Sequence, residues 1–192
     1  MVIPMNNILY LFVGKSSSGK TTIANMLEPY GYNQVWSYCT RKPRYENEPG
    51  HTFISEEAFD NLGELAAYTE YDGHRYATTI KQLESCNLYV IDVPGVKTLL
   101  EKNIKRPIVI LYFDTSVYTR IQRMQERNDS SDAIISRLLQ DEKDDWFHDL
   151  DHLVWHYRNN MAQNVHLYSI NANGNKSDVF EQVVRRINIM EG

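Results

Sequence analysis

The chain has 192 residues, which suggests one domain with, at most, small inserted subdomains. Its formal net charge of −5 leaves no broad basic surface for nucleic acid or for an anionic membrane. Two cysteines are too few for a disulfide scaffold or a four-thiolate zinc site, and with no signal-peptide pattern at the start we expect a cytoplasmic protein.

Short apolar runs, rich in β-branched and aromatic residues, predict buried strands along the chain. In chain order they cover residues 8–13, 88–93, 108–113 and 166–170, with a weaker candidate at 34–36. Helical spacing of apolar residues lies between them, at 23–30, 117–124, 134–139 and 179–187. We expect Gly31 to end the first helix and Ser131 to cap the third. Alternating strands and helices predict a three-layer α/β fold, with a parallel sheet covered on both faces.

Residues 14–21, GKSSSGKT, fit the pattern G-x-x-x-x-G-K-[ST] directly after the first apolar run. Glycines and small side chains let successive backbone N–H groups curl around phosphate oxygens, and the following helix points its positive end at the same anion. Lys20 would neutralise the β- and γ-phosphates, and the Thr21 hydroxyl would hold Mg²⁺. This context favours a nucleoside triphosphate site over a flexible serine-rich turn. The predicted nucleotide contacts are Gly14, Ser16, Ser17, Ser18, Gly19, Lys20, Thr21 and Thr22.

A second basic element follows at residues 37–50, where Arg41 and Arg44 flank Pro43. Proline fixes the backbone and holds the preceding residue extended, so the turn is stiff. Two guanidinium groups on a stiff turn can clamp a phosphate group. A solvated basic turn is the alternative, but the neighbouring phosphate loop favours the clamp.

Together these motifs resemble guanylate kinase and its nucleoside monophosphate kinase relatives. The run Thr40-Arg41-Lys42-Pro43-Arg44 matches T-R-x-P-R, residues 73–78 resemble G-x-x-Y-G-[ST], and residues 90–97 resemble D-x-x-G-V-K at a strand end. The likeness covers nearly the whole chain, in the expected order. Further matches are three arginines at lid positions and an asparagine near the adenine: Arg123, Arg127, Arg137 and Asn171.

The resemblance implies phosphorylation of a nucleoside monophosphate by ATP with Mg²⁺, and GMP or dGMP is the favoured acceptor. It implies an acceptor-binding insert at 37–83, a lid at 119–140, and a core formed by 1–36, 84–118 and 141–192. The lid arginines would close over the γ-phosphate and exclude water. Asp92 would orient either the Mg²⁺ shell or the acceptor, although a simple turn residue is the alternative. The implied acceptor contacts are Ser37, Arg41, Arg44, Tyr76 and Asp92.

The base-reading part departs from the family pattern. Carboxylates that would read guanine are replaced by Ala67 and Val90. Because an unpaired buried donor is costly, such a carboxylate discriminates strongly between bases. Glu70, Thr69 or Thr78 could substitute, and a different monophosphate stays open as the acceptor.

Three other interpretations compete with the kinase. A catalytically inactive guanylate-kinase-like binding module would explain the lost base readers, but it has no use for a complete set of phosphate-binding residues. A GTPase would explain residues 92–95 and 175–178, which fit D-x-x-G and N-K-x-D, but the spacing after the last strand is wrong. A metal site is the third interpretation, because one helix face carries His148, His152 and His156. Local bonding of these histidines is the simpler interpretation. The same segment could also form a homodimer contact.

Overall fold

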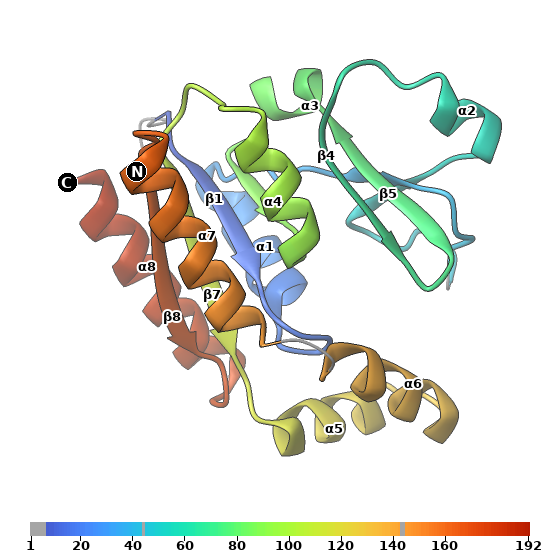
Figure 1. Ribbon diagram of the computed structural model, residues 1–192. Helices are drawn as coiled ribbons and strands as arrows, with labels where there is room; N and C mark the ends of the chain where they lie inside the picture. Colours follow the sequence, from blue (N-terminus) through green and yellow to red (C-terminus); the bar gives the residue numbers. More distant parts are fainter. Residues whose placement is uncertain (1–6, 44, 143–144) are drawn as a thin grey trace.

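The computed structural model describes residues 7–43, 45–142 and 145–192 (Figure 1). A central sheet of four parallel strands has the order β6-β1-β7-β8. Its strands are β1 (Leu9–Val13), β6 (Leu88–Val90), β7 (Ile108–Asp114) and β8 (Val165–Asn171). The four main predicted strands and the parallel sheet are therefore confirmed.

Two strand predictions need correction. The run at 88–93 ends as a strand at Val90, because Asp92 caps helix α4 (Val93–Glu101) and directs the chain into it. The weaker candidate at 34–36 forms only an isolated bridge between Gln34 and Leu88, since the chain leaves the sheet there to enter a second one.

Strand β1 shows why both faces of the sheet are covered. All five of its side chains are buried, and successive side chains point to opposite faces. Leu9, Leu11 and Val13 join the core cluster shared with α4 and α7 (Trp146–Asn160), whereas Tyr10 and Phe12 join the cluster shared with α1 (Lys20–Leu27) and α8 (Lys176–Glu191). A buried strand with no polar face requires this three-layer arrangement.

Helix ends follow local capping chemistry. Gly31, at φ +90°, ends the short 3₁₀ turn η1 (Glu28–Tyr30) that continues α1, as predicted. Helix α6 (Ser131–Asp141) is capped by Ser130, whose side chain accepts from the N–H of Ala133, and not by Ser131. The correction is one residue, because either serine offers the same hydroxyl and only the backbone path selects between them.

The second sheet has the order β3-β2-β5-β4 and is built from residues between Ser37 and Thr79. A hairpin joins β4 to β5 through Asp72 and Gly73, both with positive φ, as hairpin turns of this kind require. Figure 1 shows this second sheet to the right of the central sheet. Helices α5 (Val117–Glu126) and α6 lie below the carboxyl end of the central sheet. The elements are β2 (Ser37–Cys39), β3 (His51–Phe53), α2 (Glu56–Asp60), β4 (Leu65–Tyr71), β5 (His74–Thr79) and α3 (Ile80–Glu84).

The carboxyl ends of the central strands meet at one edge, where ligands bind in open parallel α/β sheets. The loop after β1, Asp92 after β6 and the segment leading from β7 into α5 all lie there. Within the described ranges, no helix combines the length and the apolar character needed to cross a bilayer.

Candidate active site

The loop between β1 and α1 has a backbone that larger residues could not adopt. Gly14 has φ +154°, and a Cβ built there would lie 2.9 Å from the carbonyl oxygen of Phe113 and 3.0 Å from Ser18 Oγ. Gly19, at φ +98°, turns the chain into the first turn of α1. The two glycines therefore let the loop pass close over the end of β7 and present its N–H groups at a helix N-terminus.

Lys20 curls back over this loop. Its Nζ donates to the carbonyl oxygens of Gly14 at 2.6 Å and Lys15 at 3.0 Å, and to Ser18 Oγ at 3.2 Å. Burial lowers the pKa of Lys20 to about 8, although the negative charge of Asp141 acts in the opposite direction. The ammonium group is thus held at the centre of the loop, where it faces cavities on both sides.

The cavity on the nucleotide side has a volume of about 610 Å³ and runs along the loop and α1. Both Thr21 and Thr22 line it with exposed side chains. Arg123 and Arg127 reach it from α5, and Asn175 and Lys176 from the start of α8. The structure therefore places residues 17–22 of the predicted loop and two of the three lid arginines around one open cleft, whereas Gly14 and Ser16 line another cavity.

Arg123 ties three segments together through backbone carbonyls. Its guanidinium donates to Ser17 and Ser18 of the loop at 3.4 and 3.2 Å, and to Ala172 and Gly174 at 2.8 and 3.0 Å. Partial burial lowers its pKa. Because every acceptor is a neutral carbonyl, the positive charge of Arg123 keeps its attraction for an anion in the cleft.

Arg127 and Arg137 share one carboxylate. Arg127 donates to Asp129 Oδ2 at 2.6 Å and to Ser17 Oγ at 2.9 Å, and Arg137 pairs with the same oxygen of Asp129. Burial would raise the pKa of Asp129, but the two arginines together hold it below its usual value. This pairing joins the end of α5 to α6 and holds Arg127 beside the loop.

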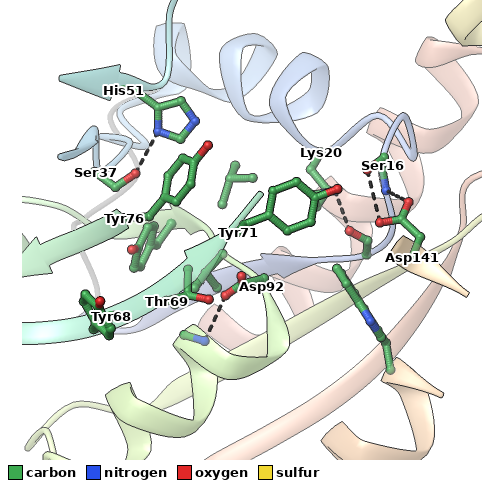
Figure 2. A pocket seen from close by; sticks show the side chains of 17 residues that line it. Ser16, Lys20, Ser37, His51, Tyr68, Thr69, Tyr71, Tyr76, Asp92 and Asp141 are labelled. Carbon is green, nitrogen blue, oxygen red and sulfur yellow. Dashed lines mark hydrogen bonds between the residues drawn. The ribbon is translucent and has the colours of Figure 1, made fainter. Parts of the chain in front are cut away.

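A second cavity, of about 200 Å³, extends from the loop to the second sheet (Figure 2). Gly14, Ser16 and Lys20 line one end, and Ser37, His51 and Tyr76 line the other. Ser37 Oγ lies 2.9 Å from Nδ1 of His51, whose ring meets Tyr76 edge-on with centroids 5.4 Å apart. The cavity therefore joins the donor loop to a polar and aromatic pocket on the second sheet.

Asp92 lines the middle of this cavity and also caps α4. Its Oδ1 accepts from the N–H of Gly95 at 2.9 Å, and its side chain also bonds to Thr69. Burial raises the pKa of this carboxyl group, although both hydrogen bonds and Lys20 oppose the rise. The helix-capping role and a role toward a ligand are therefore compatible.

Arg41 is 9% exposed and forms a two-pronged ion pair with Glu48, at 2.8 and 2.6 Å. Burial acts to lower the pKa of Arg41, but the hydrogen bonds and charge of Glu48 outweigh this effect and raise the pKa above its usual value. The guanidinium therefore stays charged. A cavity of about 530 Å³ is lined by Arg41 and Tyr76 on one side and by Arg137 of α6 on the other. The structure thus brings a predicted acceptor arginine and a predicted lid arginine to the same space.

Three predicted residues lie elsewhere, and a fourth is not described. Glu70 is exposed and paired with Tyr68, outside the cavity, because it points to the opposite face of β4 from Thr69 and Tyr71. Thr78 is fully buried and donates to Tyr89 at 2.7 Å, so only Tyr89 reaches the cavity. Asn171 bonds to Asn173 and lines neither cavity. Arg44 lies outside the described residues.

Several lining residues were not predicted from the sequence. Tyr71, Trp146 and Asp141 line the 200 Å³ cavity, and Arg120 lies buried behind Asp141. The Asp72-Gly73 pair between two runs of β-forming residues is a hairpin signal that would have placed Tyr71 near the site. No sequence signal marks Arg120 or Asp141, because a charged residue on a helix is usually solvated.

The histidines of α7 do not form a metal site. His148 and His152 have their Nε2 atoms 3.2 Å apart, and His156 bonds instead to Asn160. Across the described ranges, no three histidine, cysteine, aspartate or glutamate side chains are placed to share a metal ion. Local bonding, the simpler of the two interpretations, accounts for this face.

The donor set around the loop fits a magnesium nucleoside triphosphate. A narrow glycine cradle, loop N–H groups at a helix start and a lysine at its centre are suited to phosphate oxygens. The exposed hydroxyl of Thr21 offers the hard oxygen ligand that Mg²⁺ prefers. ATP and Mg²⁺ therefore match the residues present.

Comparison with known proteins gives the same family. The chain is 31% identical to a guanylate kinase of Geobacter metallireducens over 146 residues, which cover 69% of this chain and 71% of that protein. It is also 31% identical to a guanylate kinase of Lactobacillus acidophilus, over 67% of each chain. No family model matches the sequence. The fold resembles a crystal structure of guanylate kinase from Anaplasma phagocytophilum, with a TM-score of 0.56 and 18% identity over 99% of this chain and 87% of that one. Together with the phosphate loop and its two adjoining cavities, these similarities show that the chain belongs to the guanylate kinase family.

Proposed function

We propose that this protein transfers the terminal phosphoryl group of ATP to a nucleoside monophosphate, with GMP as the acceptor (ATP + GMP = ADP + GDP). The observation that carries the proposal is the cavity that joins Lys20 and the phosphate loop to Ser37, His51 and Tyr76. A donor in the nucleotide-side cleft and an acceptor in this cavity would meet at Lys20, which lines both. Alignment of two reactants and compensation of their charge supply most of what phosphoryl transfer needs.

The donor end would be held by the loop and the lid. Loop N–H groups and Lys20 would neutralise the phosphates, and the Thr21 hydroxyl would contribute to the Mg²⁺ shell. When bound, Mg²⁺ supplies charge compensation between phosphate oxygens. Arg123, Arg127 and Arg137, on or next to helices α5 and α6, would add positive charge and help to exclude water.

The acceptor end would be held by the second sheet. Arg41 supplies a permanent charge beside Tyr76 for the acceptor phosphate. Ser37 and His51 offer a hydrogen-bonding pair for the base, with Thr69 and Asp92 further along the cavity. We therefore propose that residues 37–83 bind the acceptor and that residues 119–140 act as the lid, so that their closure assembles the site.

A substrate survey tests this function. Formation of ADP from MgATP is measured with GMP, dGMP, AMP, CMP, UMP and dTMP, and without acceptor. We expect turnover with GMP or dGMP well above the others. Lys20→Ala should abolish it, whereas Lys81→Ala, at an exposed position on α3, should leave it unchanged. Turnover with a different monophosphate would overturn the base assignment, and no stimulation by any acceptor would overturn the kinase.

A further inference from the structure

A carboxylate from the lid lies on the phosphate loop. Asp141, the last residue of α6, is 1% exposed. Its Oδ2 accepts from the backbone N–H of Ser16 at 2.7 Å, and its Oδ1 accepts from Ser16 Oγ at 3.2 Å. The N–H of Ser16 belongs to the segment predicted to bind phosphate, so this contact places an internal anion where a ligand anion is expected.

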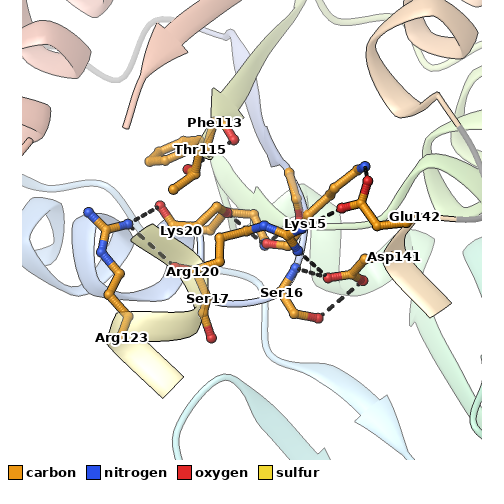
Figure 3. A network of polar contacts seen from close by, with 12 residues as sticks. Lys15, Ser16, Ser17, Lys20, Phe113, Thr115, Arg120, Arg123, Asp141 and Glu142 are labelled. Carbon is orange, nitrogen blue, oxygen red and sulfur yellow. Dashed lines mark hydrogen bonds and ion pairs between the residues drawn. The ribbon is translucent and has the colours of Figure 1, made fainter. Parts of the chain in front are cut away.

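A buried arginine holds the same oxygen. Arg120 of α5 is fully buried, and its Nη1 donates to Asp141 Oδ2 at 2.8 Å. Its Nη2 pairs with Glu142, which also lies 3.0 Å from Lys15 Nζ (Figure 3). The position of Oδ2 is therefore an oxyanion site with one loop amide and one guanidinium as donors, which is the donor set typical of a bound phosphate oxygen.

The guanidinium of Arg120 is not fully paired. Its Nε is buried and has no hydrogen-bond partner among the described residues, while Nη1 and Nη2 contact Asp141 and Glu142. A buried donor without a partner carries a desolvation cost, so the two carboxylates leave this guanidinium incompletely satisfied.

The location of Asp141 identifies which phosphate it would meet. The nucleotide-side cleft is lined by residues 17–23, and the acceptor-side cavity by Gly14, Ser16 and Asp141. Lys20 is the loop residue common to both. A nucleotide that enters along α1 would therefore reach Ser16 only with its terminal phosphate, at the boundary with the acceptor cavity.

We propose that the Ser16 amide and Arg120 form a binding site for the terminal phosphate of the nucleoside triphosphate, and that Asp141 occupies this site as a displaceable stand-in until the triphosphate binds. This inference rests on the function proposed above. A carboxylate and a phosphate cannot share one oxyanion site, because like charges at hydrogen-bonding distance repel strongly. Release of Asp141 would free the end of α6, so binding of the triphosphate, and not of the diphosphate, is coupled to movement of the lid.

Two variants separate the effect of the Asp141 charge from that of the Arg120 guanidinium. Asp141→Asn keeps the shape but removes the competing charge, so the ratio of dissociation constants for the diphosphate over the triphosphate should rise about tenfold. The double variant Arg120→Met/Asp141→Leu replaces the buried pair by apolar side chains, which folded proteins usually tolerate. It lacks the guanidinium, so its ratio should be about tenfold below that of Asp141→Asn.

The experiment is isothermal titration calorimetry of the full chain with MgADP and with the magnesium complex of the β,γ-imido analogue of ATP, without acceptor. Asp132→Asn removes the same charge from an exposed position in the first turn of α6 and should leave the ratio as in the wild type. Thermal unfolding of each variant checks that it is folded.

The outcomes distinguish failure of this inference from failure of the proposed function. Equal ratios in the wild type, Asp141→Asn and the double variant would show that the Arg120–Asp141 pair is only structural. This result would overturn the displaceable carboxylate but not the proposed kinase function. A wild type that binds neither nucleotide would overturn both. A ratio in Asp141→Asn about tenfold above the ratios of both the wild type and the double variant would support the displaceable carboxylate and assign Arg120 to the terminal phosphate.

Discussion

The hydroxyl of Ser37 and Nδ1 of His51 lie 2.9 Å apart at the acceptor end of the cavity. They are brought together because β2 and β3 pair in parallel, with Ser37 opposite His51. No carboxylate stands at positions 67 and 90, so this hydrogen-bonding pair is one group in the cavity that can recognise the edge of a base.

Ser37→Ala should therefore raise the KM for GMP about tenfold, equivalent to about 1.4 kcal/mol, because it removes one hydrogen bond and leaves His51 without this contact. The KM for ATP should not change, since the hydroxyl lies at the far end of the cavity. Steady-state kinetics with each substrate varied in turn measures both values. Ser85→Ala, at an exposed helix end, is the control. An equal rise in both KM values would argue that Ser37 acts on the loop instead.

Glu48 is expected to contribute to stability as well as to the position of Arg41. Glu48→Gln keeps the size of the side chain but leaves the buried guanidinium without its countercharge. The free energy of unfolding should fall by about 2–3 kcal/mol, since loss of one partner of a buried pair is costly. Urea denaturation measures this change, and Glu46→Gln, at an exposed position in the same turn, should have little effect. Equal stability of the two variants would mean that water reaches the pair.

The pKa of Lys20 predicts an alkaline limit to activity. Burial lowers this pKa to about 8, and the ammonium form is the one that attracts phosphate. The kcat/KM for ATP, which reports the free enzyme, should therefore fall as the pH rises through about 8. A pH–rate profile between pH 6 and about 10 measures this limb. Lys20→Arg stays charged over the whole range, so whatever activity it retains should lack the limb. The same limb in both proteins would assign it to another group.

Gly14 is expected to tolerate no side chain. In Gly14→Ala, the new Cβ would lie 2.9 Å from the carbonyl oxygen of Phe113, and the backbone has φ +154°. The loop must shift, at a cost of about 1–3 kcal/mol, and binding of ATP and ADP should weaken together. Calorimetry and thermal unfolding measure the two effects. Gly63→Ala, where no atom lies within 4 Å of the new Cβ, should be neutral. Normal nucleotide binding by Gly14→Ala would show that the loop can relax at no cost to its function.

Local patterns were sufficient where the chemistry is contiguous in the chain. The phosphate loop needs its glycines, its lysine and its threonine within eight residues, between a buried strand and a helix, so residues 14–21 alone predicted it. The central strands were predictable because a strand buried on both faces must be apolar throughout. The N-cap predicted for α6 was one residue off, with Ser130 in place of Ser131.

Long-range pairing decided the rest. The side chains of Ser37 and His51 meet through a sheet whose strands are three to seven residues long, too short for a clear periodic signal. Strand register then sent Glu70 outward and Thr69 and Tyr71 inward, which residue type could not reveal. Thus the sequence by itself determined the phosphate loop, the parallel core and the family, because local backbone chemistry and burial set them. Only the tertiary structure decided that Arg120 and Asp141, 21 residues apart on two helices, meet at Ser16, because the helix packing that joins them leaves no mark in the order of the residues.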